Sequence, residues 1–400
     1  EVSLSPEATL TAWRGEKVHT QILVSSKESI KNVSVTVSDL KSQSGATIKN
    51  DRVSTGFVQY VMADEFAGGC GHRKPADFDS SYQADIINTA ISSTGISANS
   101  LQPVWVTVTV PADAKGGIYS GMITVHTSKK HQLKMQLKVT DRVLPPASEW
   151  KYDLDLWQHP AAVARVHKVA LWSPEHFSLM KKYYTMLADA GQKNITASIV
   201  NEPWGHQTYD DYPSLIKWIK KADGSWQYDY SLFDKYVEFV MSCGIKGRIS
   251  CYSMVPWKIA FTYYDEGLKK EMVSTDAIGS EGYNSFWKTM LVDFTKHLKE
   301  KKWFDKTYIA MDERPMAAMQ SVIGLLKSID PDWKIALAGE YHQEIEKDIF
   351  NYCIASKWKF PDDVLASRKQ QGKVSTWYTC CTEKYPNAFT FSPPAEMVWM

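Results

Sequence analysis

The segment VLPPAS at residues 143–148 divides the sequence into two parts with different hydrophobic patterns. Its two consecutive prolines can continue neither a helix nor the hydrogen-bond ladder of a sheet. We therefore place a domain boundary here, with one domain over residues 1–146 and a second over residues 147–400. A chain of 400 residues is long enough to bury two hydrophobic cores.

The part before this segment predicts a β-sandwich. Hydrophobic and polar residues alternate in several runs, which is typical of strands with one buried face. Turn-forming residues separate the runs, and the glycine-rich stretch at residues 68–73 is expected to be a long loop, since it lacks the spacing of a phosphate-binding loop. The clearest alternating runs are residues 18–24, 33–37, 104–110 and 133–139.

The part after the segment predicts short strands alternating with amphipathic helices, the order that gives a parallel sheet. Ser173 and Pro174 are typical of a helix start, and Gly191 of a helix end. Residues 231–243 and 285–300 predict two further amphipathic helices.

Eight strand candidates in this rhythm predict a (β/α)8 barrel of the TIM type. The last candidate ends close to Met400, so the closing helix is expected to be absent or truncated. The candidates are residues 152–157, 195–200, 246–252, 307–311, 334–338, 350–354, 374–378 and 388–391.

Composition points to a neutral ligand. The 46 basic and 45 acidic residues give a net charge of +1, which creates no field that would attract nucleic acid or an anionic membrane. Fifteen Trp and 20 Tyr residues are a heavy aromatic content, and aromatic faces suit the C–H faces of sugars, although most of these rings are expected in the core.

No apolar run is long enough to insert into a membrane, and the chain starts with Glu1 rather than Met. We therefore expect a secreted or periplasmic protein, from a bacterium, whose export signal has been removed. The six cysteines show neither a metal-ligand spacing nor a disulfide framework, so free thiols and no cofactor are expected.

Catalytic groups of such barrels lie at the carboxyl ends of the strands. The strongest candidate is the stretch YIAMDERP at residues 308–315, an apolar strand followed by Asp312 and Glu313. Two carboxylates cannot be buried without partners, so they are expected to face a polar cleft. The alternative is structural: Asp312 would cap the next helix and Glu313 would pair with Arg314.

Two neighbouring carboxyl groups do not ionise easily together, which raises the pKa of one of them. The pair then supplies one proton donor and one anion, the two groups that glycoside cleavage requires.

The chain resembles glycoside hydrolase family 123. The resemblance rests on the strand ending in Asp312 and Glu313, on the preceding β-sandwich, and on the stretch DGSWQYDYSLFD at residues 223–234. It implies a retaining exo-glycosidase, a β-N-acetylgalactosaminidase acting on glycosphingolipid-type glycans. The residues alone do not decide between galacto and gluco configuration, and the resemblance favours galacto.

The resemblance also implies substrate-assisted catalysis, in which the 2-acetamido oxygen of the sugar attacks the anomeric carbon. Asp312 would then orient the acetamido N–H and stabilise the oxazolinium-like intermediate. Glu313 would protonate the leaving oxygen and afterwards activate water.

Further residues that follow the strand candidates would bind the sugar. Tyr378 is expected to donate to the acetamido oxygen, and His159 and Asn201 could bind ring hydroxyls. The other substrate-binding candidates are aromatic: Trp204, Trp257, Trp358, Trp377 and Tyr341.

Three other hypotheses stay open. Asn-Glu-Pro at residues 201–203 also marks the acid/base of barrel glycosidases with an enzyme nucleophile, which would give Glu202 that role with Glu340 or Glu383 as nucleophile. A sugar-binding protein without catalysis is the second. Metal-assisted hydrolysis is the third, although His159, His206 and His342 form no recognised metal motif.

Overall fold

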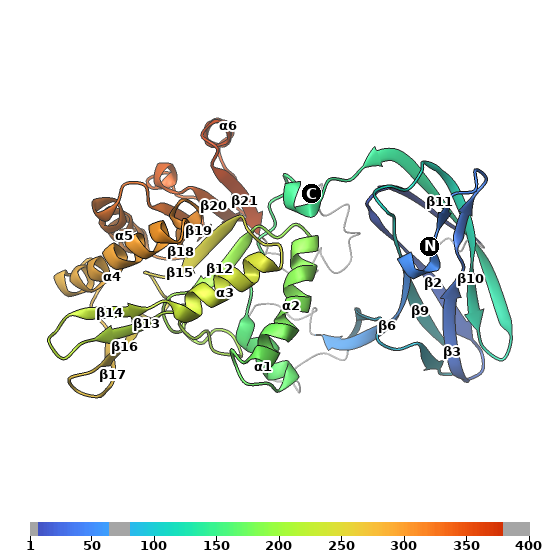
Figure 1. Cartoon of the computed structure of the whole chain (residues 1–400), viewed down its shortest axis with the longest axis horizontal. Helices are drawn as coiled ribbons and strands as arrows, with labels where there is room; N and C mark the ends of the chain where they lie inside the picture. The colour runs from blue at the N-terminus through green and yellow to red at the C-terminus, as the bar shows by residue number, and fades with distance from the viewer. Residues whose placement is uncertain (1–6, 64–80, 379–400) are drawn as a thin grey trace. The chain divides into compact units, whose positions relative to one another are not determined.

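The structure is a computed structural model that describes residues 7–63 and 81–378. The described residues divide into two compact units between Pro146 and Ala147, within the VLPPAS segment. Both units are shown in Figure 1, the first in blue to green and the second in green to red.

The first unit is a β-sandwich of two sheets that share one core, as the sequence predicts. One sheet has the order β1-β11-β10-β3-β8, with β4 and β5 attached beside β10, and the other has the order β2-β9-β6-β7. The strands are β1 (Glu7–Arg14), β2 (Lys17–Ser26), β3 (Ile30–Val37), β4 (Leu40–Ser42), β5 (Thr47–Ile48), β6 (Val53–Ala63), β7 (Ser81–Asn88), β8 (Ser93–Ile96), β9 (Ser100–Thr109), β10 (Gly117–His126) and β11 (Lys130–Val143).

Strand β9 shows why the alternating runs form this core. Val104, Val106 and Val108 have no exposed surface, whereas Trp105 and Thr107 between them lie on the opposite face. Side chains alternate between the two faces of a strand, so one face of each sheet is apolar and packs on the other sheet.

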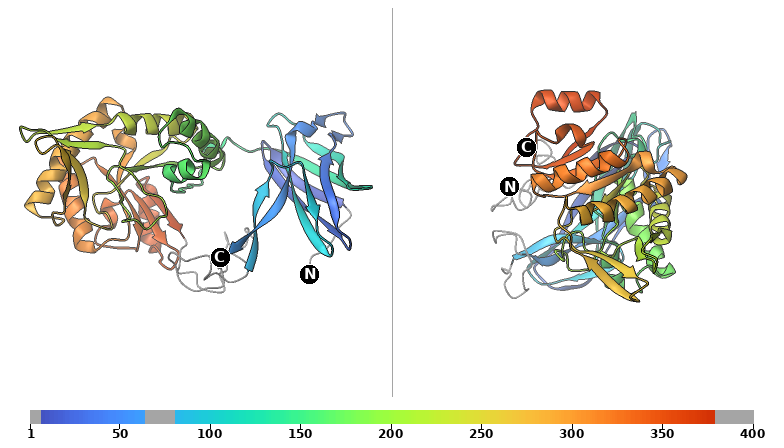
Figure 2. Two further views of the ribbon diagram at one scale, coloured as in Figure 1. Left: turned by 90° about the horizontal axis from the view of Figure 1, so that it is seen from below. Right: turned by 90° about the vertical axis from the view of Figure 1, so that its left-hand side faces the viewer.

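The second unit is built on a parallel sheet with the order β12-β15-β18-β19-β20-β21, which curls into a half-barrel (Figure 2). Its strands follow each other in chain order with helices between most of them, as the βα pattern predicts. The strands are β12 (Asn194–Ser198), β15 (Arg248–Tyr252), β18 (Thr307–Met311), β19 (Lys334–Gly339), β20 (Asn351–Ala355) and β21 (Val374–Tyr378), and the helices are α1 (Pro160–His167), α2 (Pro174–Asp189), α3 (Ser231–Ser242), α4 (Glu281–Glu300), α5 (Met316–Ile329) and α6 (Asp362–Gln370).

The closed (β/α)8 barrel is not what the described residues form. Residues 152–157 make no strand; only Leu154 forms an isolated bridge, to Gln192. The acidic side chains beside Leu154 bond to the ends of neighbouring strands instead, with Asp153 on Arg248 and Asp155 on Asn194. The eighth candidate, residues 388–391, lies outside the described residues.

A small mixed sheet that the sequence patterns did not predict has the order β14-β13-β16-β17, with β13 and β16 parallel and the two outer pairs antiparallel. It covers α4, where Trp218 stacks on Phe286 with ring centroids 4.9 Å apart. Its strands are β13 (Lys217–Lys220), β14 (Trp226–Asp229), β16 (Phe261–Asp265) and β17 (Lys270–Ser274). Most of the residue 223–234 stretch therefore belongs to β14 and to the start of α3.

The two faces of the parallel sheet differ in polarity, and this difference positions the site. Ile195, Ile249, Ile309 and Ile335 are fully buried within the larger core that includes α2 to α5. On the other face, Ser250 of β15 lies between Thr196 of β12 and Tyr308 of β18, and these polar side chains line that face. That face is the inside of the half-barrel.

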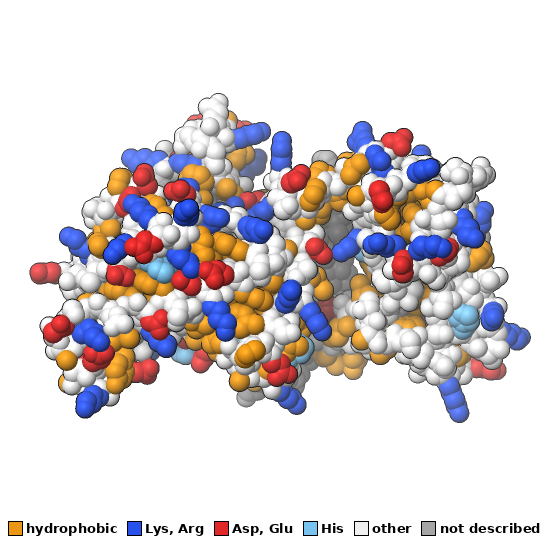
Figure 3. All heavy atoms as spheres, viewed as in Figure 1, with side chains coloured by type: hydrophobic (Ala, Val, Ile, Leu, Met, Phe, Trp, Pro, Cys, Tyr) orange, Lys and Arg blue, Asp and Glu red, His pale blue; other side chains and the backbone are white. Residues whose placement is uncertain are grey.

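The remaining sequence expectations concern helices, thiols and charge. Ser173 caps α2 by accepting from the His176 N–H, as predicted. The described cysteines, Cys243, Cys251 and Cys353, are free, and the other three lie outside the described residues. None of the described helices is long and apolar enough to span a membrane. Acidic and basic side chains intermingle on the face in Figure 3.

Candidate active site

Asp312 follows a strand whose five residues are all buried. On β18, Tyr308 and Ala310 share the inner face of the half-barrel, and Asp312 continues this alternation one step past the strand end. It is not a helix cap, because α5 begins at Met316 with Pro315 as its N-cap residue. The structural alternative for Asp312 is therefore wrong.

Three N–H donors converge on the Asp312 carboxylate. The Trp257 indole Nε1 donates to Oδ2 over 2.8 Å, and the Glu313 backbone N–H donates to Oδ1 over 2.9 Å. The Trp204 side chain also hydrogen-bonds to Asp312. An ionised carboxylate accepts hydrogen bonds at both oxygens, whereas a protonated one carries a proton on one of them. The N–H donors therefore favour the ionised form of Asp312.

Burial nevertheless raises the pKa of Asp312, and the charge of Glu313 adds to that rise against the effect of the donors. The raised pKa thus falls on the carboxyl group that the resemblance assigns as the anion. A half-buried carboxylate whose ionised form is disfavoured in this way is stabilised by any further N–H or positive charge beside it. An acetamido N–H that becomes part of a cationic intermediate is such a partner.

Glu313 is exposed, whereas Asp312 is half-buried. The Tyr378 hydroxyl at the end of β21 donates to its Oε1. Gly339 at the end of β19 lies against the Glu313 side chain, and a Cβ at Gly339 would be 3.3 Å from Glu313 Cγ. Glu313 is therefore held between the ends of β19 and β21.

An aromatic cluster of three rings lies beside Asp312. Trp204 and Tyr252 are both 4% exposed, whereas Trp157 is 39% exposed. Their ring centroids lie 4.9 to 5.1 Å from one another. The cluster gives the inner face of the half-barrel an apolar wall next to the carboxylate. Trp157 and Tyr252 were not among the substrate-binding candidates, although each is the last residue of a strand candidate.

The structure brings three of the predicted residues to the carboxylates and a fourth to the neighbouring turn. Trp204, Trp257 and Tyr378 contact them directly, and Trp358 lies in the turn after β20, next to Tyr378. The prediction that Tyr378 donates to the substrate is untested, since here its hydroxyl is bonded to Glu313.

Two predicted aromatic residues lie elsewhere. Trp377 precedes Tyr378 on β21, so its side chain points to the opposite face of the sheet, and it is 57% exposed. Tyr341 packs with Tyr352 and Phe360 on the helix-covered side, with ring centroids 6.1 and 5.6 Å away.

His159 and Asn201 have structural partners. His159 stacks on Tyr212 with ring centroids 3.7 Å apart, its Nε2 bonds to the Asp210 carbonyl, and burial lowers its pKa. Asn201 Oδ1 accepts from the Ser214 N–H over 2.7 Å. Both contacts hold the loop between β12 and β13, so direct contact with sugar hydroxyls stays a prediction.

The carboxylates of the alternative mechanism are dispersed. Glu202 accepts backbone N–H bonds from His206 and Tyr212, one on each oxygen. Glu340 pairs with Lys357 at 3.7 Å on the rim, and Glu383 lies outside the described residues.

Glu202 also belongs to a group that could bind a cation. Glu202, His206 and Asp211 each offer a ligand atom within 4.8 Å of the others. His206 and Asp211 are exposed, with side chains 66% and 75% accessible, and they pair with each other at 3.2 Å. The three residues line an open pocket of about 370 Å³, so the group has ligand chemistry but is accessible to water.

Two family models match this chain. The model described as the catalytic domain of glycoside hydrolase 123 matches residues 157–400, and the model described as the N-terminal domain of glycoside hydrolase 123 matches residues 2–127. A search of curated protein sequences finds no match.

The chain is also similar to solved structures. One is a family 123 glycoside hydrolase from Clostridium perfringens, described in terms of glycolipid glycan hydrolysis, with 30% identity, a TM-score of 0.87, and coverage of 98% of this chain and 70% of that one. A Bacteroides ovatus GH5 xyloglucanase has 9% identity, a TM-score of 0.25, and coverage of 89% and 70%. The Pseudomonas aeruginosa CupB2 chaperone has 6% identity, a TM-score of 0.20, and coverage of 34% and 55%. The last two scores are too low to support an argument.

Proposed function

The chain belongs to glycoside hydrolase family 123 and is a glycosidase, and we propose that it removes terminal β-linked N-acetylgalactosamine from glycans with retention of configuration. The observation that carries this proposal is the environment of Asp312. It is a half-buried carboxylate with three N–H donors and an aromatic wall beside it. This environment suits the N–H and the methyl group of a 2-acetamido substituent.

In the first step the acetamido oxygen of the substrate bonds to the anomeric carbon as the glycosidic C–O bond breaks. Glu313 gives its proton to the leaving oxygen, and Asp312 accepts the acetamido N–H while positive charge develops on the ring that forms. The negative charge of Asp312 is held in place before the reaction starts, so it stabilises that charge without reorganisation.

In the second step Glu313, now ionised, takes a proton from water as the water oxygen attacks the anomeric carbon. The bond to the acetamido oxygen breaks and the acetamido group is restored. Two inversions at one carbon give net retention.

The position of Glu202 supports this mechanism over an enzyme nucleophile. The alternative mechanism needs Glu202 as acid/base, with an oxygen free to reach the leaving group about 5 Å from a nucleophilic carboxylate. Both Glu202 oxygens already accept backbone N–H bonds. Asp312 is adjacent to Glu313 but has its oxygens bonded to N–H donors.

The class of substrate rests on the similarity to the clostridial enzyme. That enzyme is described as hydrolysing glycolipid glycans, and we extend glycosphingolipid oligosaccharides to this chain as its proposed substrate. The proposal includes action outside the cytoplasm, where such glycans are accessible.

The direct test uses 4-nitrophenyl 2-acetamido-2-deoxy-β-galactoside. The protein should release nitrophenol and, by NMR, the β-anomer of the sugar first. GalNAc-thiazoline, which mimics the cyclised intermediate, should inhibit it competitively. Asp312→Asn and Glu313→Gln should each lose most of kcat. Turnover at normal speed in both variants, or initial release of the α-anomer, would overturn the mechanism.

An azide experiment separates the roles of the two carboxylates. Azide needs no general base and can replace water in the second step. With an activated aryl leaving group, azide should therefore restore activity to Glu313→Gln and yield the β-glycosyl azide. It should not restore activity to Asp312→Asn. Measurable affinity of the native protein for the sugar without any nitrophenol release would indicate a binding protein instead.

A further inference from the structure

The rim between the ends of β19 and β21 carries an exposed tryptophan that the mechanism above does not use. Trp358 is 41% exposed and stands in the turn that follows β20. Strand β20 lies between β19 and β21 in the sheet. Glu313 is held between Gly339 on β19 and Tyr378 on β21. The turn of Trp358 is therefore the part of the rim next to Glu313.

Backbone bonds fix this turn against β21. Ala355 pairs with Tyr378 in the ladder, the Ser356 N–H donates to the Tyr378 carbonyl over 2.8 Å, and the Trp358 N–H donates to the Ala355 carbonyl over 2.8 Å. The residue that binds Glu313 and the residue that displays the indole are thus joined through two hydrogen bonds.

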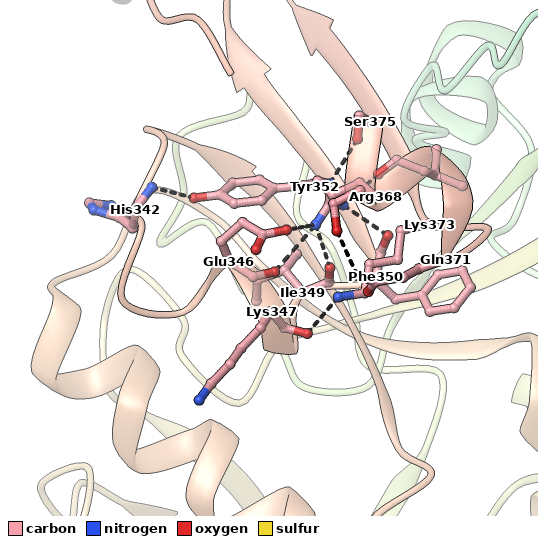
Figure 4. Close-up of polar contacts among 12 residues, drawn as sticks. His342, Glu346, Lys347, Ile349, Phe350, Tyr352, Arg368, Gln371, Lys373 and Ser375 are labelled. Carbon is pink, nitrogen blue, oxygen red and sulfur yellow. Dashed lines mark hydrogen bonds and ion pairs between the residues drawn. The ribbon is translucent and has the colours of Figure 1, made fainter. Parts of the chain in front are cut away.

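Packing on both sides keeps the turn in place. Phe360 lies against Tyr341 and Tyr352, with ring centroids 5.6 and 5.5 Å away. The Tyr352 hydroxyl donates to the Glu340 carbonyl and accepts from the His342 N–H, each over 2.7 Å. The second of these bonds is drawn in Figure 4. The end of β19 and the turn after β20 are therefore tied to one another.

Beneath the rim, Arg368 of α6 binds β20 and β21 together. It has no exposed surface and donates to the carbonyls of Phe350 and Val374 and to the Ser375 hydroxyl (Figure 4). Trp358 therefore stands on a scaffold that does not need to rearrange when a ligand binds, which lowers the entropic cost of binding.

Polar groups border one side of the indole. Lys357 Nζ lies 5.4 Å from the Trp358 ring centroid and 3.7 Å from Glu340 Oε1. The cation lies over one face of the ring and the carboxylate pairs with that cation. A pyranose has one C–H face that stacks on an aromatic ring and hydroxyls around its rim that bind such charged groups.

We propose that Trp358 is the platform for the leaving-group sugar, the residue directly attached to the N-acetylgalactosamine that is removed. This inference rests on the proposed function, because it places the leaving oxygen at Glu313. The sugar carrying that oxygen must begin within hydrogen-bond reach of the Glu313 carboxyl group, and Trp358 is the exposed aromatic residue of the adjacent turn. Lys357 and Glu340 bind its hydroxyls.

The test compares two donors with the same sugar and different leaving groups. One is 2-acetamido-2-deoxy-β-galactosyl fluoride, whose leaving group is a single atom. The other is a disaccharide with N-acetylgalactosamine β-linked to galactose. For Trp358→Ala, kcat/KM on the disaccharide should fall about tenfold or more, while kcat/KM on the fluoride stays within about twofold. Trp358→Phe keeps an apolar ring, so its kcat/KM on the disaccharide should lie between those of the native protein and Trp358→Ala.

Trp13→Ala is the matched control. Trp13 lies in β1 of the sandwich, is 38% exposed, and has the Arg142 guanidinium 5.4 Å from its ring. This variant should leave both rates unchanged. Equal rates of Trp358→Ala and native protein on the disaccharide, or an equal loss on both donors by both Trp358 variants, would overturn the assignment of Trp358. A native protein that cleaves neither donor would instead overturn the proposed function.

Discussion

The hydrogen bond from Trp257 to Asp312 gives the sharpest test of the site. Trp257→Phe removes the Nε1 donor, 2.8 Å from Asp312 Oδ2, and keeps an aromatic ring in place. A hydrogen bond to a charged group contributes about 1.5–3 kcal/mol. Trp257 is 41% exposed, so water can partly replace the lost donor and the lower end of this range applies. The expected loss in kcat/KM is about tenfold.

The same substitution should move the pH profile. The Trp257 donor lowers the pKa of Asp312, against burial, which raises it. Loss of a donor that favours the anion raises this pKa further. The mechanism requires Asp312 ionised. The acidic limb of kcat/KM against pH should therefore shift to higher pH, and the variant should lose most activity on the acidic side.

The measurement is kcat/KM against pH with the nitrophenyl substrate, for the native protein, Trp257→Phe and the control Trp13→Phe. A variant with native kcat/KM and an unshifted acidic limb would refute the argument that Asp312 acts as an anion stabilised by this donor. A uniform loss at all pH values would show that the indole matters only for packing.

Three further variants test other parts of the structure. Asp312→Asn loses one acceptor for its N–H donors at every pH, but only the native protein should lose stability as pH rises to the raised folded-state pKa of Asp312, because ionisation of this carboxyl group in the folded state costs stability; the melting temperature of the variant should therefore rise relative to that of the native protein between low and neutral pH, and a difference independent of pH would contradict this. Glu202→Gln should lose about 1–3 kcal/mol of unfolding free energy, since an amide has one acceptor for two backbone N–H groups, yet keep kcat within about threefold; near-complete inactivation with rescue by azide would instead favour Glu202 as acid/base. Arg368→Met should lower the unfolding free energy by about 3–5 kcal/mol in urea denaturation, because it leaves Glu346 and four carbonyls without a donor; a loss below about 1 kcal/mol would show that the buried cation is not stabilising.

Local sequence patterns determined most of the secondary structure. The alternating valines of β9 and the apolar run of β18 indicate directly which residues are buried, because burial requires apolar side chains at a fixed period. The capped helix α2 was predictable for the same reason, since Ser173 bonds to a neighbour three residues away.

Closure of the sheet was not predictable in this way. Residues 152–157 alternate like a strand, yet Asp153 and Asp155 use their side chains on Arg248 and Asn194. The sequence shows that these residues are acidic. It does not show that their partners, Arg248 and Asn194, lie at the starts of two other strands. That choice depends on contacts between residues about 40 to 95 positions apart.

The active site shows the same difference between local sequence information and long-range contacts. The sequence by itself determined that Asp312 and Glu313 stand together at a strand end, because adjacency in the chain and the end of an apolar run are both local. Only the tertiary structure decided that Trp257 donates to Asp312, that Trp377 faces away, and that Trp157 and Tyr252 stand beside the carboxylate. These residues come from different strand ends, and only the curl of the sheet brings them within contact distance.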